Sequence, residues 1–173
     1  MKGLTMKKTD QEDTGRLPPL THSQWTALVV LRVLIGWHFL YEGIVKILNP
    51  YWSSAGYLVE SQWILSGFFK SIVANPTVLK FVDLLNEWGL VLIGTVLIAG
   101  CFTRVSSIAG IVVLLLYYVC NPPLIGFTSS VPSEGSYLIV NKNLIELAAL
   151  FVLLLFPTGR VMGLDVLMSK IKK

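Results

Sequence analysis

Four stretches of apolar residues dominate this chain, and their lengths are close to that of a membrane-spanning helix. They are residues 25–48, 78–102, 105–119 and 137–156. A helix needs about 20 apolar residues to cross the hydrocarbon layer, so the third stretch would have to stand nearly upright. Prolines end the third and fourth stretches, at Pro122-Pro123 and at Pro157, because proline cannot continue a helix. The pattern predicts an all-α, polytopic membrane protein built as a bundle of four transmembrane helices.

The connection between the first two stretches, residues 49–77, has an apolar periodicity of its own. Within residues 61–73 the large apolar side chains fall on one broad face of a helix. This segment is too short to cross a bilayer. We therefore expect a partly helical outer loop, whose helix lies in the membrane interface or caps the outer end of the bundle.

Lysine and arginine residues gather on one side of the four predicted spans. They occur in residues 1–24, at Arg104 in the turn between spans two and three, and in residues 160–173. Cytoplasmic segments carry the excess of basic residues, so both termini should be cytoplasmic. We expect the membrane to be a bacterial inner membrane. We expect a mobile cytoplasmic tail over residues 1–24, one membrane domain over residues 25–165 and a basic cytoplasmic tail over residues 166–173.

Composition narrows the choice of partners. The chain of 173 residues is 54% hydrophobic and 14% charged, whereas soluble domains carry about 25% charged residues. The net charge of +4 comes largely from the two ends, which favours the lipid bilayer as a partner and disfavours nucleic acid. Cys101 and Cys120 would lie about 25–28 Å apart at opposite ends of span three, too far for a disulfide.

Ionisable residues in the first span are the strongest functional signal. Arg32, His38, Glu42 and Lys46 fall within a stripe about 120° wide on one helix. A charge in hydrocarbon costs about 2.5–3.5 kcal/mol even on the most lenient scale, so these groups need partners. The stripe should therefore face the interior of the bundle.

Carboxylates from two other spans are expected at the depth of Glu42. Glu87 in span two and Glu146 in span four reach this level, and Lys142, Asn143 and either Tyr117 or Tyr118 lie near it. Two interpretations stay open: an ion-pair network that fixes the helix register, or a pocket whose carboxylates move protons or hold a polar head group. The candidate catalytic residues are Glu42, Glu87 and Glu146. The candidate binding residues are Arg32, His38, Lys46, Tyr118, Lys142 and Asn143.

Several short motifs along these spans resemble the DoxX family of small membrane proteins. They are Glu42-Gly43-Ile44-Val45-Lys46, Glu87-Trp88-Gly89, Phe102-Thr103-Arg104, Asn141-Lys142-Asn143 and Pro157-Thr158-Gly159-Arg160. The resemblance implies a four-span helical bundle. It also points to the relatives called DoxD, the quinone-reducing membrane subunit of thiosulfate:quinone oxidoreductase.

Two functions from different classes follow. The first is the membrane subunit of a quinone-linked oxidoreductase acting on a sulfur compound such as thiosulfate, with a periplasmic or membrane partner subunit. The sequence encodes no redox cofactor motif or metal site, and the resemblance to DoxD implies quinone as the cofactor. The alternative is a non-catalytic membrane partner or assembly factor that binds a lipid, a small solute or another protein. A homo-oligomer is compatible with both, and a transporter is disfavoured because four spans are few.

Overall fold

A computed structural model describes residues 19–124 and 138–165, and the secondary-structure elements in these two ranges are all helices. They are α1 (His22–Leu48), α2 (Ala55–Val59), α3 (Ser66–Ala74), α4 (Pro76–Ala99), α5 (Thr103–Cys120), α6 (Lys142–Leu155) and the short 3-10 helix η1 (Thr158–Arg160). The all-helical prediction is confirmed for these residues. Most of the predicted amino-terminal tail and all of the predicted carboxy-terminal tail lie outside the described residues.

Three of the helices, α1, α4 and α5, are long and apolar enough to cross a membrane, within the described ranges. Helix α6 has 14 residues and is therefore only about 21 Å long, shorter than a hydrocarbon layer of about 30 Å. The predicted fourth span began at residue 137, but the helix begins at Lys142, after the capping residue Asn141. The structure thus supports a membrane protein with three helices that could span the membrane, and the fourth span stays a prediction.

Local sequence explains where the long helices begin and end. Thr21 and Gln24 form a capping box at the start of α1, and the Asn75 side chain accepts from the first amides of α4, directly before Pro76. Helix α4 ends at Gly100, which has a φ of +68°. The prediction that this helix continues to Phe102 is therefore wrong, because a left-handed glycine ends it.

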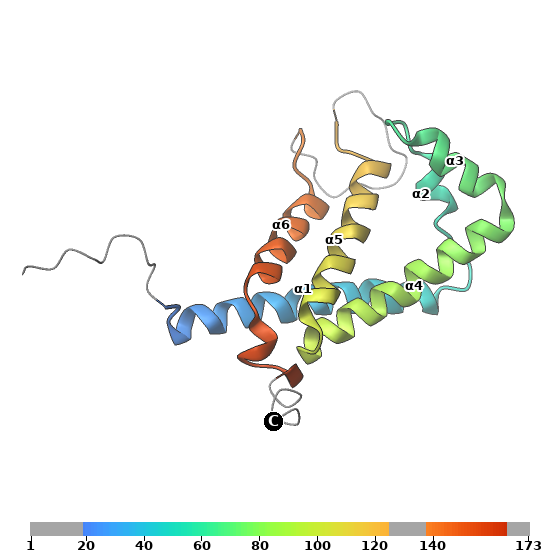
Figure 1. Cartoon of the computed structure of the whole chain (residues 1–173). Helices are drawn as coiled ribbons and strands as arrows, with labels where there is room; N and C mark the ends of the chain where they lie inside the picture. The colour runs from blue at the N-terminus through green and yellow to red at the C-terminus, as the bar shows by residue number, and fades with distance from the viewer. Residues whose placement is uncertain (1–18, 125–137, 166–173) are drawn as a thin grey trace, which may run out of the picture.

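The long helices form two pairs that are inclined to each other (Figure 1). Helix α1 packs along α4, and α5 packs along α6, while contacts between the pairs are fewer. In Figure 1, α1 lies across the view and α5 and α6 run up it. The arrangement differs from a bundle of four nearly parallel helices, in which neighbours incline by about 20°.

Close packing between α1 and α4 depends on glycine. A Cβ atom on Gly94 would overlap the backbone of Leu40 and Gly36, so the two helices approach at a distance that only glycine allows. Around this crossing lies the main apolar core, with members on all four long helices: Ile35, Phe39, Leu90, Ile93, Leu97, Leu114, Leu150 and Leu153. The core therefore fills the middle of the molecule.

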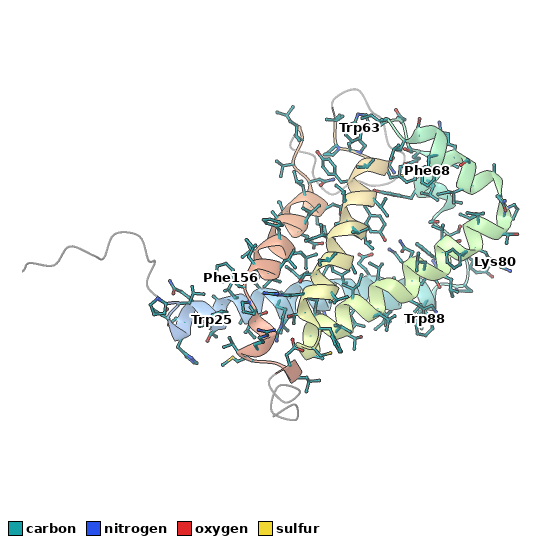
Figure 2. The ribbon with its side chains drawn as sticks, in the orientation of Figure 1. Trp25, Trp63, Phe68, Lys80, Trp88 and Phe156 are labelled. Carbon is teal, nitrogen blue, oxygen red and sulfur yellow. The ribbon has the colours of Figure 1, made fainter. Side chains whose placement is uncertain are left out.

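The two ends of the molecule are built differently. At the end we call the tail end, the turn between α4 and α5 meets η1, and Trp25 stacks edge-on against Phe156 with ring centres 6.3 Å apart (Figure 2). At the opposite end, the connection end, α2 and α3 pack on α4 and α5 through a second apolar cluster of Leu58, Phe69 and Cys120. The connection is thus partly helical, and the side of the membrane on which it lies stays a prediction.

Candidate functional site

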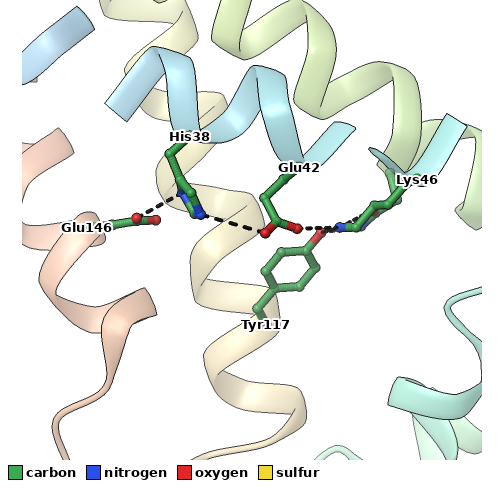
Figure 3. A network of polar contacts seen from close by, with 6 residues as sticks. His38, Glu42, Lys46, Tyr117 and Glu146 are labelled. Carbon is green, nitrogen blue, oxygen red and sulfur yellow. Dashed lines mark hydrogen bonds and ion pairs between the residues drawn. The ribbon is translucent and has the colours of Figure 1, made fainter. Parts of the chain in front are cut away.

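Four ionisable side chains form a line near the connection end of α1, which we call the charged chain: Glu146, His38, Glu42 and Lys46 (Figure 3). Glu146 comes from α6, and the other three residues follow one another at every fourth position of α1. This spacing places them on one face of the helix, since residues four apart are neighbours on a helix surface. Figure 3 shows that this face is turned toward α5 and α6.

His38 lies between the two carboxylates. Its Nδ1 atom is 2.9 Å from Oε1 of Glu146, and its Nε2 atom is 3.8 Å from Oε1 of Glu42. Neither ring nitrogen makes a hydrogen bond of good geometry, and Oε2 of Glu146 is also buried without a hydrogen-bond partner. The short contact to Glu146 is therefore electrostatic, with the ring not aligned for a linear hydrogen bond.

Lys46 is the most firmly held member of the charged chain. Its Nζ atom lies 3.1 Å from Oδ1 of Asn86, 3.3 Å from the Tyr117 hydroxyl and 3.9 Å from Oε2 of Glu42. The rings of Trp52 and Tyr117 also face the ammonium, with centres 5.1 and 5.4 Å away. Cation–π contacts of this kind stabilise a cation that has lost part of its hydration.

Signs of charge alternate along the line when His38 carries a proton. Glu146 and Glu42 are then negative, while His38 and Lys46 are positive, so the four groups sum to zero. Neutral pairing of this kind is what a medium of low dielectric constant requires of buried charges. An imidazole can take a proton at one nitrogen and release one at the other, so the arrangement can pass protons between the two carboxylates. The 3.8 and 3.9 Å contacts would need a bridging water or a side-chain rotation for this step.

The connection closes the Lys46 end of the charged chain. Tyr57 donates a hydrogen bond of 2.8 Å to the carbonyl of Tyr117, and the Asn121 amide donates to the carbonyl of Tyr57 at 2.8 Å. Burial raises the pKa of Tyr57 well above its ordinary value, so its hydroxyl stays a donor. Asp83 of α4 accepts from the backbone and side chain of Ser54 at 2.9 and 2.5 Å, directly before α2.

The remaining predicted residues near the connection end are Glu87, Lys142, Asn143 and Tyr118. Glu87 is half-buried on α4. Lys142 and Asn143 are half-buried in the first turn of α6. The Tyr118 hydroxyl donates to the carbonyl of Ile139 at 2.8 Å, so Tyr118 does not join the charged chain.

Arg32 does not join the charged chain, which corrects the expectation that it serves the same cluster. Its guanidinium lies at the tail end, 2.7 Å from the Met162 carbonyl and 3.4 Å from the Thr158 hydroxyl. The negative charge of Asp165 also acts on it. Arg32 shares the helix face, but it precedes Lys46 by 14 residues, which corresponds to about 21 Å along the helix axis. The angular argument ignored this axial distance.

Sequence reasoning missed two of the residues that hold Lys46, Asn86 and Trp52. Asn86 also donates to the Tyr117 hydroxyl at 2.5 Å, so it links α4 to α5. An amide side chain inside a predicted span was a usable signal, because buried amides in membranes are expected to find partners. Trp52 comes from the connection, whose path between the helices the sequence does not reveal.

Comparisons with known proteins give one result. The family model described as DoxX matches residues 27–120, which is more than half of the chain. A search of curated proteins finds no match, and a search of solved structures finds none. The matched range contains most of α1 and all of α4 and α5, with His38, Glu42 and Lys46, and it ends before α6, which supplies Glu146. The chain is a membrane protein of the DoxX family.

Proposed function

We propose that this protein is the membrane subunit of a quinone-linked oxidoreductase, and that the charged chain delivers protons to the quinone. Reduction of a quinone to a quinol consumes protons together with electrons, so a membrane site for it needs groups that pass protons. The observation that supports this proposal most strongly is the Glu146–His38–Glu42 arrangement, an imidazole held between two carboxylates of different helices.

Glu146 and His38 would be the groups closest to the quinone. Their buried atoms Oε2, Nδ1 and Nε2 have unused hydrogen-bonding capacity, which suits a ligand that offers a carbonyl or a hydroxyl group. Lys46 would hold Glu42 in place rather than contact the ring, because its own contacts already surround it. The electrons would come from a donor such as thiosulfate on a partner subunit, as the DoxD resemblance suggests.

The test is quinone reduction by the purified protein in proteoliposomes, with thiosulfate as donor, alone and with co-purifying proteins. We expect Glu146→Gln to lower the rate by about 100-fold, since a positioned general acid or base contributes about 10²–10⁴. Glu60→Gln, which removes a carboxylate that follows α2, is the matched control and should leave the rate unchanged. No reduction with any donor and partner, or full activity of Glu146→Gln, would reject the proposal.

A second candidate is a non-catalytic membrane partner or assembly factor. It is favoured by the apolar side chains that the connection exposes around α3, namely Ile64, Leu65 and Phe68, which are 75%, 42% and 58% exposed. Such side chains need lipid or another protein to cover them. This candidate gains support if the Glu146→Gln variant changes only the yield of protein, and if a partner co-purifies without turnover.

We also propose that α6 and the residues before it form a fourth span, with both termini on the cytoplasmic side of a bacterial inner membrane. Leu138, Ile139 and Val140 extend the apolar stretch beyond the start of α6. Four spans would return both ends to one side, and the basic residues would then follow the positive-inside rule. Reporter fusions at the two termini, which are active on only one side of the membrane, test this topology.

A further inference from the structure

We infer that Glu42 is the point at which the charged chain meets water, and that an apolar layer seals the chain from the tail end. The protons of the proposed reaction would then come only from the side on which the α2–α3 connection lies. The inference rests on the proposed function for the use of the protons. The exposure of Glu42 and the apolar layer are features of the structure.

Exposure differs strongly along the charged chain. The side chain of Glu42 is 44% exposed, whereas those of His38, Glu146 and Lys46 are 29%, 17% and 15% exposed. A carboxylate this exposed cannot face acyl chains without a large cost, so it must face water or a polar ligand. Glu42 lies only six residues, or about 9 Å, before the end of α1 at Leu48, which places it near the connection end.

The Lys46 end offers no comparable access. Asn86, Tyr117 and Trp52 surround the ammonium, and Tyr57 fixes the connection above them. The Glu146 end is also covered, because the unpartnered oxygen of that carboxylate is buried. Glu42 is therefore the residue of the charged chain that water can reach.

An apolar layer separates His38 from the tail end. The residues of α1 that are buried between Arg32 and Glu42 are Ile35, Gly36 and Phe39. Helices α4, α5 and α6 complete the layer with Ile93, Leu97, Leu114, Leu150 and Leu153, of which each is at most 7% exposed. Two of the buried hydroxyls of α5 lie beside this layer: Ser106 donates to the Ile93 carbonyl, and Ser107 is fully buried. Neither hydroxyl titrates, so the layer provides no acidic or basic group that could relay a proton.

The tail end itself is closed below this layer. Arg32 is 2% exposed and Thr158 is fully buried, and the turn after α6 covers both. A Cβ atom on Gly163 would overlap the backbone of Gly100, which shows how tightly this turn packs. The charged chain and the Arg32 cluster are thus two separate polar regions with an apolar layer between them.

Cysteine labelling from each side of the membrane tests this inference. In a background with Cys101→Ser and Cys120→Ala, single cysteines are placed at Glu42, at Ile35 in the apolar layer and at Tyr51, which is 93% exposed on the connection. A fourth protein restores Cys101, which lies in the α4–α5 turn and reports the tail end. A charged, membrane-impermeant maleimide is added either outside sealed vesicles or inside them.

We expect Glu42→Cys to react with the maleimide from the side that labels Tyr51→Cys and not to react from the side that labels Cys101. Ile35→Cys should react from neither side. Reaction of Glu42→Cys from the Cys101 side would overturn the inference. So would reaction only with a lipid-soluble maleimide, since the residue would then face lipid.

A second measurement uses the wild-type chain, in case Glu42→Cys does not fold. An impermeant paramagnetic chelate should broaden the ring resonances of His38 only from the Tyr51 side, and broadening from the other side would contradict the inference. Neither measurement needs electron transfer. If the wild-type protein is inactive but the labelling is one-sided, the quinone proposal is rejected and the inferred access from the Tyr51 side stands. If the wild-type protein is active but Glu42→Cys is labelled from the Cys101 side, the inferred access is rejected and the quinone proposal stands.

Discussion

Two polar clusters lie at opposite ends of one apolar core, and they differ in how well their groups are satisfied. At the tail end, Arg32 is almost fully buried and donates to a backbone carbonyl and a hydroxyl from a single tight turn, while its Nε atom is buried without a partner. At the connection end, His38 and Glu146 have buried atoms without hydrogen-bond partners, and the Glu42 side chain is 44% exposed. The first cluster is built to hold helices together, whereas the second retains capacity to bind or to exchange a proton.

The comparison shows why a charge in a span is not by itself a functional site. Arg32 would look like the most costly charge in α1, yet its contacts join α1 to the turn that follows α6. His38 looks less costly, but it meets carboxylates from two helices. Both regions hold buried atoms without a hydrogen-bond partner, one on Arg32 and three on His38 and Glu146. The two carboxylates that meet His38, rather than burial alone, therefore separate the two regions.

Arg32→Ala should have the largest effect on stability. The variant loses two hydrogen bonds from a charged donor and leaves a cavity, which together should lower the free energy of unfolding by about 2–4 kcal/mol. Thermal unfolding in detergent measures this change. Arg104→Ala, which removes an exposed arginine at the same end, is the control and should stay within about 0.5 kcal/mol. If Glu146→Gln destabilised the protein as much as Arg32→Ala, the contrast between the two clusters would fail.

Gly94→Ala should come next, because Gly94 lies in the crossing that separates the clusters. The added methyl group would overlap the Leu40 backbone and push α1 from α4, at a cost of about 1–3 kcal/mol. Gly89→Ala is a matched control on the same helix, since a Cβ atom there meets nothing within 4 Å. Equal melting temperatures for the two variants would contradict the close approach of the helices.

Tyr57→Phe should have the smallest effect, about 1 kcal/mol, through the lost hydrogen bond to the Tyr117 carbonyl. Burial raises the pKa of Tyr57, so the folded protein keeps this proton at a pH where the unfolded chain releases it. The stabilisation is therefore complete below about pH 10 and falls as the pH rises further. Alkaline unfolding curves should be less steep for Tyr57→Phe than for the wild type, and Tyr51→Phe should leave them unchanged.

Hydropathy predicted the long helices α1, α4 and α5 well, because a helix in a membrane has to satisfy its backbone hydrogen bonds within itself. The residues at which helices end or begin were harder to predict. Gly100 ended α4 before Phe102, and α6 began at Lys142, since Asn141 caps it. These differences come from single residues in turns, which an average over a window of hydropathy does not see.

The candidate site could be predicted only in part. The i, i+4 spacing placed His38, Glu42 and Lys46 on one face of α1, and depth along the spans indicated that Glu146 could reach them. The sequence could not show that Arg32 donates to the turn at Thr158 and Met162, because that turn is distant in the chain. Nor could it show that Trp52 lies over Lys46, because the path of the connection depends on tertiary packing.

The contact between His38 and Glu146 is the central claim, because it joins α6 to the charged chain of α1. Nitrogen NMR of the imidazole rings in proteoliposomes tests it directly, with the wild type compared against Glu146→Gln. The account predicts that both ring nitrogens of His38 shift in the variant while those of the exposed His22 do not. Identical His38 spectra in the two proteins would show that the side chains do not meet.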